Sequence, residues 1–297
     1  MFQTLIRGFK LALTTPRFLI NPNPERYYEF LGDDVVEGQH EAFADPNKPL
    51  WLNLGYWKTA RTYPEAAREL AEQLGQAAQF NASDVVLDVG FGFAEQDLFW
   101  LERFNVRHIT GVNITAMQVE RARSRIAQRG LQDRIDLRVG SATELAFEAA
   151  SFDKITALEC AHHFDTRQRF FQEAFRVLRP GGRLATADGI SSAGDPAPGL
   201  VQKISLKRWC VPLTNVYDSA EYARRLHELG FVNVQVESIR KYVFPGCIKY
   251  QNLRNKGQTL YEAKIDLTQQ EIDDCFGLDL FKLTGLTDYV LVSAQKP

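Results

Sequence analysis

The sequence predicts an α/β protein with a doubly wound, Rossmann-like sheet, and three observations support this. Short apolar runs of strand character alternate with segments whose apolar residues recur at helical spacing. The run at 85–89 leads directly into two glycines, Gly90 and Gly92. A helix start follows them, and a glycine turn between a strand and a helix is where backbone approaches a nucleotide-like ligand closely.

Length and composition are those of one elaborated domain. The 297 residues, 45% of them hydrophobic, can bury one large core together with an accessory element. A formal net charge of -2, without blocks of Lys or Arg, argues against a nucleic-acid partner. The four cysteines lie far apart and indicate neither a metal site nor a disulfide framework. We therefore expect a reducing, cytoplasmic location, with no secretory signal and no membrane-spanning segment.

The first expected strand, 85–89, contains Asp88 and runs into the glycine turn. A dinucleotide fingerprint has a third glycine three residues after the second. This chain has Glu95 there. A carboxylate beside that helix start would repel a pyrophosphate, so a ligand without phosphates is favoured.

The run that contains Asp88, Gly90, Gly92 and Ala94 resembles motif I of the class I S-adenosyl-L-methionine (SAM) dependent methyltransferases. The resemblance implies SAM as the cofactor, bound by Asp88, Gly90 and Gly92. It also implies the family's seven-stranded methyltransferase sheet with an antiparallel last strand. A glycine turn of an unrelated α/β protein is the alternative.

The second expected strand, 109–113, ends at Asn113, where a doubly wound fold places the residue that meets a ribose. The segment around it, with Ile114 and Gln118, resembles the small-molecule branch of the family, which includes tocopherol, sterol and natural-product enzymes. The resemblance implies that all three residues contact the cofactor. An asparagine that only closes a strand is the alternative.

The third expected strand, 135–139, leads into Ser141 and Ala142. The family usually has an acidic residue in this loop that meets the adenine amine. Ser141 replaces that acid, which leaves the backbone at Ala142 as a further expected adenine contact.

The fourth expected strand lies in 152–164 and should end in the ligand crevice with Glu159, His162 and His163. Histidine is the usual general base near neutral pH, and the resembling family has histidine at this position. Adjacent strand residues point to opposite faces, so one histidine should face the acceptor, and we favour His163. A structural role for either histidine is the alternative.

Apolar residues at helical spacing between 170 and 178 predict the next helix, and the breakers at 179–182 should end it. The fifth expected strand, 183–188, then ends at Asp188. The Leu-Arg-Pro-Gly-Gly run before it is a further resemblance to the same family. We expect Asp188 to orient the acceptor hydroxyl or an imidazole, and a loop cap is the alternative.

The chain organises into four parts. We expect N-terminal helices and an aromatic lid over 1–78, a SAM-binding core over 79–238, a cap over 239–287 and the last core strand over 288–297. By the resemblance, Tyr56 of the lid sits over SAM, and packing against the N-terminal helices is the alternative. The cap separates expected strands six and seven, 231–236 and 288–294, and is long enough to be functional. It should form a wall of a hydrophobic acceptor pocket, while burial against the sheet stays equally open.

Residues 1–15 have apolar side chains at helical spacing. They could form an interfacial helix with weak membrane-surface contact. Few basic residues accompany them, so a helix docked on the body or on a second subunit of a homodimer is favoured.

These observations predict a SAM-dependent methyltransferase that moves a methyl group to a hydroxyl of a small, hydrophobic metabolite, assisted by His163 or His162. The alternative within the class is carbon methylation of an isoprenoid or aromatic acceptor, with Glu159 near the cationic intermediate. From another class, the chain could be a SAM-binding protein without catalysis, because a fold does not guarantee a function.

Overall fold

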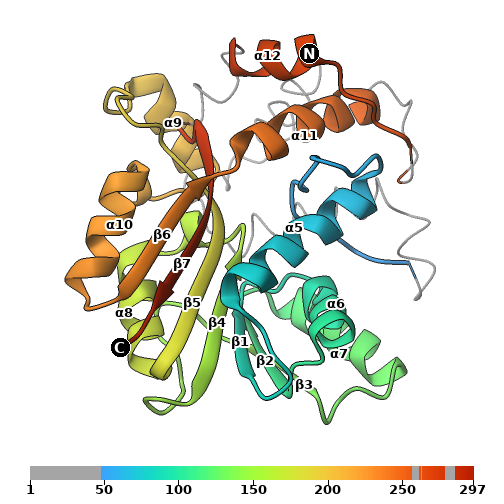
Figure 1. Ribbon diagram of the computed structural model, residues 1–297, viewed down its shortest axis with the longest axis vertical. Coiled ribbons are helices and arrows are strands. Elements are labelled where there is room, and N and C mark those ends of the chain that lie inside the picture. Colours follow the sequence, from blue (N-terminus) through green and yellow to red (C-terminus); the bar gives the residue numbers. More distant parts are fainter. Residues whose placement is uncertain (1–47, 256–260, 262, 278–284) are drawn as a thin grey trace.

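The computed structural model describes residues 48–255, 261, 263–277 and 285–297. Its centre is a seven-stranded sheet in the order β3-β2-β1-β4-β5-β7-β6 (Figure 1). The strands are β1 (Val85–Val89), β2 (His108–Asn113), β3 (Ile135–Val139), β4 (Phe152–Leu158), β5 (Leu178–Ile190), β6 (Val232–Ser238) and β7 (Asp288–Gln295). The helices are α5 (Tyr63–Ala78), α6 (Glu95–Phe104), α7 (Ala116–Gln128), α8 (Arg167–Val177), α9 (Leu200–Arg208), α10 (Ser219–Glu228), α11 (Arg240–Asn255) and α12 (Gln269–Gly277), with 3-10 turns η1 (Ala161–His163) and η2 (Leu213–Asn215).

The direction of the strands confirms the predicted fold class. Strands β1 to β5 pair in parallel, while β7 is antiparallel to both β5 and β6. The chain enters the sheet at β1, adds β2 and β3 on one side, and then crosses to the other side of β1 to form β4. The switch point between β1 and β4 is where doubly wound sheets bind ligands, at the carboxyl ends of the strands.

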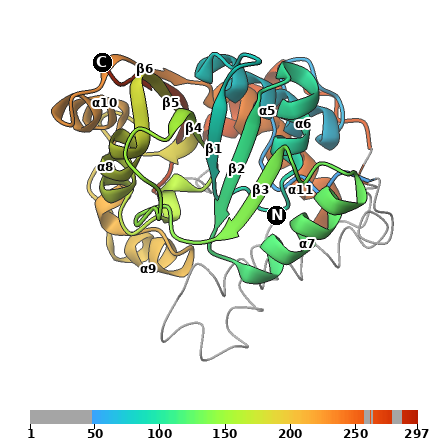
Figure 2. The same cartoon turned by 90° about the horizontal axis from the view of Figure 1, so that it is seen from below.

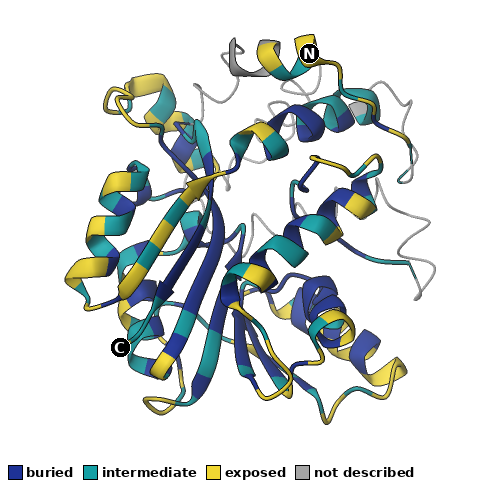
Figure 3. Cartoon of the chain, viewed as in Figure 1, coloured by how far each residue is buried: buried dark blue, intermediate teal, exposed yellow. Residues whose placement is uncertain are grey.

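Helices cover both faces of the sheet (Figure 2). Neighbouring residues of β1 divide between the two resulting cores, because side chains alternate along a strand. Val86 joins the core beneath α5, α6 and α7, and Leu87 joins the core beneath α8 and α10. The central strands are buried from both sides, whereas β6 at the edge stays largely exposed (Figure 3).

Strand β5 begins earlier than the sequence predicts. The breakers do end α8 at Val177, but β5 starts at Leu178 rather than at residue 183. Leu178 already pairs with Phe152 of β4. Beyond it, the Gly181 amide donates to the Lys296 carbonyl, and the Lys296 amide donates to the Gly182 carbonyl. Partners from distant segments therefore hold these residues in the sheet, which local propensity does not indicate.

The insertion between β6 and β7 carries α11 and α12 and packs against the segment that precedes α5. The Trp57 amide donates to the Tyr242 carbonyl at 2.6 Å. The rings of Tyr63 and Tyr250 stack with centroids 4.6 Å apart. Aromatic residues that are distant in sequence thus form one core between α5 and α11.

No helix among the described residues has the length and apolarity needed to cross a bilayer. The predicted amphipathic helix at 1–15, with its membrane and subunit alternatives, lies outside the described residues.

Replacement of Gly246 in α11 should destabilise this aromatic core. A Cβ at Gly246 would lie 2.1 Å from Cγ of Trp57. Gly to Ala in a helix ordinarily stabilises slightly, but this overlap should dominate, so Gly246→Ala should lower the free energy of unfolding by about 1–3 kcal/mol. Urea denaturation measures the change. Gly199→Ala, at the N-cap of α9, is the control without overlap, since the nearest neighbouring atom would lie 3.7 Å away, and it should destabilise less. Equal stability of the Gly246 variant and the wild type would contradict the prediction.

Candidate active site

The glycine turn after β1 has the conformation that the sequence predicts. Gly90 and Gly92 have φ of +75° and +59°, which favours glycine. A Cβ at Gly90 would lie 2.6 Å from Cys160 Sγ, and a Cβ at Gly92 would lie 2.8 Å from Leu52 Cδ1. The turn is therefore closely enclosed by the end of β4 on one side and by the segment before α5 on the other.

Asp88 supports this turn from within the sheet. Its fully buried carboxyl accepts hydrogen bonds from Gln96 Nε2 at 3.0 Å and from Thr156 Oγ1 at 2.9 Å. Gln96 Nε2 also donates to the carbonyl of Phe91 in the turn, at 3.1 Å. Asp88 therefore braces the turn through Gln96.

A second buried carboxyl, Asp97, lies beside Asp88. Burial raises the pKa of Asp88 to about 7, against the opposing effect of its hydrogen bonds to Thr156 and Gln96. Burial and the neighbouring Asp88 raise the pKa of Asp97 well above its ordinary value. Two adjacent carboxyls do not both ionise readily, so the pair retains a proton near neutral pH.

Glu95, which occupies the place of a third glycine, forms an ion pair with Arg125. Both side chains are less than a tenth exposed. The expected repulsion of a pyrophosphate by Glu95 therefore needs correction, because the arginine neutralises the carboxylate. The bulk of a side chain at this position remains as the difference from the dinucleotide motif.

The residues predicted to meet the ribose lie together after β2. Asn113 and Gln118 are buried, and Asn113 Nδ2 donates to Gln118 Oε1 at 2.8 Å. Ile114 between them is 41% exposed. This arrangement presents one apolar side chain beside an ordered amide pair.

The residues predicted near the adenine follow β3. The Ser141 hydroxyl lies 2.9 Å from the Thr143 hydroxyl, and Ala142 is buried between them. Because β1, β2 and β3 are parallel neighbours, this loop lies at the same edge of the sheet as the glycine turn.

The segment before α5 crosses that edge. Leu52 packs against Phe93 and covers Gly92, and the Leu54 amide donates to Glu159 Oε2 at 2.9 Å. Tyr56 is turned toward α5 and α11, with its ring centroid 5.0 Å from that of Tyr242. The part of the expected lid that lies over the turn is thus 52–54, whereas Tyr56 packs among aromatic residues.

Glu159 connects three elements just beyond the end of β4. Besides the Leu54 amide, it accepts a hydrogen bond from the Tyr289 hydroxyl of β7 at 2.6 Å. Burial raises the pKa of Glu159 to about 8, although both hydrogen bonds oppose that shift. The carboxyl is therefore largely uncharged at neutral pH.

The two histidines require a correction to the sequence analysis. They lie in the 3-10 turn η1 rather than on a strand, so strand alternation does not separate them, and their ring centroids are 3.9 Å apart. His162 Nδ1 contacts Asp188 Oδ1. His163 is 7% exposed and its Nδ1 lies 3.4 Å from the Cys210 carbonyl. Burial, followed by the neighbouring His162, lowers the pKa of His163 well below its ordinary value.

Sequence reasoning missed two residues that complete this group, Arg167 and Asn215. Arg167 Nη2 donates to Asp188 Oδ2 at 2.9 Å, and Asn215 Nδ2 donates to the His162 carbonyl at 3.1 Å. Arg167 begins a helix after the N-cap Thr166 and resembles an ordinary charged residue of a first turn. Asn215 has no motif around it.

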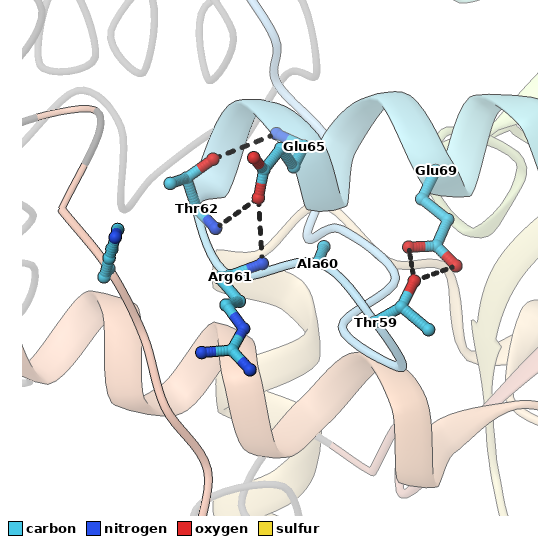
Figure 4. A pocket seen from close by; sticks show the side chains of 7 residues that line it. Thr59, Ala60, Arg61, Thr62, Glu65 and Glu69 are labelled. Atoms are coloured by element: carbon cyan, nitrogen blue, oxygen red, sulfur yellow. Dashed lines mark hydrogen bonds between the residues drawn. The ribbon is translucent and has the colours of Figure 1, made fainter.

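A hollow of about 520 Å³ lies elsewhere, at the start of α5 (Figure 4). The Glu65 carboxylate accepts from the Thr62 amide while the Glu65 amide donates to the Thr62 hydroxyl, and Thr59 donates to Glu69. The contacts between Thr62 and Glu65 cap α5, and together with the bond between Thr59 and Glu69 they occupy polar groups that a ligand would otherwise contact. Within the described ranges, no cluster of His, Cys, Asp and Glu could hold a metal ion.

Comparison with known proteins gives consistent matches. Residues 87–186 match a family described as a methyltransferase domain. The chain is 37% identical over 279 residues to the erythromycin 3''-O-methyltransferase of Saccharopolyspora erythraea, covering 91% of this chain and 89% of that protein. It is 31% identical to the 27-O-demethylrifamycin SV methyltransferase of Amycolatopsis mediterranei, covering 87% and 95%.

Solved structures agree on the fold. A geranyl diphosphate methyltransferase in complex with SAM is similar with a TM-score of 0.62 at 20% identity, over 79% of this chain and 87% of that one. The cyclase SpnF is similar with a TM-score of 0.65 at 18% identity, over 93% and 97%.

Glu159→Gln should reduce the pH dependence of stability. The folded chain holds the Glu159 proton that the unfolded chain releases above the ordinary pKa of 4.5, so the free energy of unfolding falls as pH rises from there to about 8. Glutamine cannot ionise, and its amide retains an acceptor for Leu54 and a donor for Tyr289. The slope should therefore be shallower in the variant, by less than about 1.4 kcal/mol per pH unit, the limit for one proton.

Urea denaturation at several pH values between about 5 and 8 tests this. Glu102→Gln, on the exposed face of α6, is the control and should parallel the wild type. Parallel slopes for the wild type and Glu159→Gln would contradict the assignment of a held proton to Glu159.

Proposed function

The chain belongs to the class I SAM-dependent methyltransferases, and we propose that it methylates a hydroxyl of a hydrophobic natural product with His162 as the general base. The observation that carries the proposal is the His162–Asp188 pair, at the same edge of the sheet as the glycine turn. The two relatives named for erythromycin and 27-O-demethylrifamycin SV support an acceptor of that kind.

The residues at the sheet edge fit SAM. The turn at Gly90 and Gly92 has no room for a Cβ, so backbone is what it offers to a ligand. Asn113, ordered by Gln118, suits a ribose, and exposed Ile114 suits the adenine face. SAM, when bound, supplies a methyl group that its sulfonium already activates.

Ser141 and Ala142 complete the proposed adenine end of the cofactor site. The mixed surface of a hydroxyl and a buried methyl suits a base that has both polar edges and an apolar face. Asp88 is fully buried, so we assign it the support of the turn rather than direct contact. Tyr56 packs beside α11, which supports a role in holding the lid rather than in covering SAM.

His162 is poised for proton transfer. Asp188 occupies Nδ1, which leaves Nε2 to accept the proton of the acceptor hydroxyl as the oxygen is methylated. Burial alone would raise the pKa of Asp188, but Arg167 and His162 together hold it below its ordinary value. Asp188 is therefore ionised, and its contact with Nδ1 orients the His162 ring.

His163 has a structural role in this proposal, in place of the catalytic role that the sequence favoured. Its lowered pKa and its contact with the Cys210 carbonyl suit a neutral ring that packs beneath His162. The pair thus divides into one ring held by a carboxylate and one ring held by backbone.

Carbon methylation is less well supported than oxygen methylation. A cationic intermediate would need a nearby negative charge, and Glu159 is largely uncharged at neutral pH. A SAM-binding protein without catalysis stays the alternative of another class, because a fold does not guarantee a function. The position of the His162–Asp188 pair at the same edge of the sheet as the glycine turn favours catalysis.

We also propose the four-part organisation with a cap over the acceptor pocket and a cytoplasmic location. For residues 1–15, the proposed alternatives are contact with a second subunit of a homodimer and contact with a membrane surface. Co-sedimentation with liposomes, for the full chain and for a chain that lacks residues 1–15, separates the last two, because only a lipid contact makes the full chain sediment preferentially.

The acceptor class can be tested with two defined probes. Purified protein with trideuteromethyl SAM should add one labelled methyl group to 3''-O-demethylerythromycin or to 27-O-demethylrifamycin SV, or to both. Mass spectrometry detects the transfer, and carbon NMR distinguishes an O-methyl from a C-methyl product. Tight S-adenosylhomocysteine binding by calorimetry, with no transfer to either probe or to an extract of natural products, would favour the non-catalytic alternative.

With whichever probe accepts the label, His162→Ala should lower kcat by about 100-fold to 10,000-fold, the usual contribution of a general base. The Kd for S-adenosylhomocysteine should change by less than about threefold, because His162 contacts Asp188 rather than the cofactor turn. His163→Ala should have the smaller effect on kcat. Unchanged turnover in both single variants and in the double variant would eliminate the histidine base.

A further inference from the structure

Arg167 is a fully buried cation in contact with the group that holds the proposed base. Its Nη2 donates to Asp188 Oδ2 at 2.9 Å and to the Gly189 carbonyl at 3.1 Å. Its guanidinium also lies near two aromatic rings, 4.8 Å from the Tyr217 centroid and 5.2 Å from that of Tyr222. A buried arginine that donates to a carboxylate and to a neighbouring carbonyl in this way is fixed in position.

Asn215 joins Arg167 to the turn that carries His162. Its Oδ1 accepts from the Arg167 amide at 2.9 Å, and its carbonyl accepts from Arg167 Nη1 at 3.0 Å. Its Nδ2 donates to the carbonyls of His162 and Phe164. Asn215 thus contacts the Arg167 guanidinium through its own backbone carbonyl, and its side chain joins the start of α8 to the backbone of η1.

The carboxylate of Asp188 contacts both the proposed base and a cation. Asp188 Oδ1 contacts His162 while Oδ2 contacts Arg167, so the carboxylate lies between the imidazole and the guanidinium. Without the guanidinium, the buried carboxylate would keep its contacts with His162 and the Gly189 amide, and it would favour the protonated imidazole. A protonated histidine cannot accept a proton.

We propose that Arg167 is a positioning residue that pairs with Asp188 and thereby weakens the attraction of this carboxylate for a protonated His162. The inference rests on the proposed role of His162. Asn215 holds Arg167 and η1 in the relative position that this requires.

Other groups also face the Asp188–His162 pair. Against it pack His163 of η1, Arg167 of α8, Glu159 and Cys160 beyond β4, Tyr217 before α10, Tyr222 of α10 and Tyr289 of β7. Among these, Arg167 is the residue whose cation pairs with Asp188. Its removal should therefore change the protonation of His162 more than removal of an arginine outside the group.

The test follows the imidazole directly and needs no acceptor. The full chain, labelled with ¹⁵N-histidine, is titrated by NMR, and the His162 signals are assigned by their loss in His162→Gln. In Arg167→Gln, the pH midpoint of His162 should rise by at least about one unit, a tenfold gain in proton affinity. Arg167→Lys retains the cation and should shift the midpoint less.

Two comparisons separate charge from structure. Asp188→Asn should shift the midpoint downward, and the double variant Arg167→Gln, Asp188→Asn should return toward the wild type. Arg225→Gln is the matched control, because Arg225 also packs on Tyr217, at 4.2 Å, but pairs with Glu221. If Arg167→Gln does not fold, the double variant is compared with Asp188→Asn alone and must have the higher midpoint.

An unchanged or lowered midpoint on loss of Arg167 overturns the inference, and so does an equal rise in Arg225→Gln. The result is independent of the proposed function. A raised midpoint together with full turnover in His162→Ala would retain the charge relation and refute the base. A loss of turnover in His162→Ala with no shift of the midpoint on loss of Arg167 would support His162 as the base and refute the role of Arg167.

Discussion

The buried carboxylate of Asp188 is the constraint around which this site is built. A carboxylate without contact to water is stable only where protein groups replace its hydration. Arg167 and His162 do so from two sides, and the Gly189 amide also donates to it, at 3.1 Å. The start of α8, the turn η1 and the end of β5 must therefore keep their relative positions for the fold to tolerate this charge.

The sequence predicted the parts of the site that depend on local pattern. Gly90 and Gly92 stand out because few backbones need two such glycines so close together, and Asp188 was found because an apolar run ends at it. The sequence did not reveal Arg167 and Asn215, which meet across 48 residues. Their partners come from the end of β5 and from η1, and only the packing of the chain brings these together. The same reason applies to the early start of β5, which is held by Lys296.

Around the proposed cofactor turn, buried carboxyls are stabilised either by an ion pair or by a retained proton. Glu95 forms an ion pair with Arg125, which opposes the rise that burial causes in the pKa of Glu95. Burial also raises the pKa values of Asp88, Asp97 and Glu159, so that the Asp88–Asp97 pair and Glu159 each retain a proton near neutral pH. A protonated carboxyl can donate as well as accept hydrogen bonds, which suits groups that must hold backbone and hydroxyl partners rather than attract ions. The polar framework beneath the turn is therefore structured without a large excess of negative charge.

The close contact of Trp57 with Gly246 has an evolutionary consequence. The indole occupies the space that any side chain at 246 would need, although the two positions are far apart in the sequence. A larger residue at one position is tolerated only with a smaller residue at the other, since coupled neighbours do not mutate independently. Among homologues, the two positions should covary, and the aromatic entry segment and the insertion should be inherited as a matched pair.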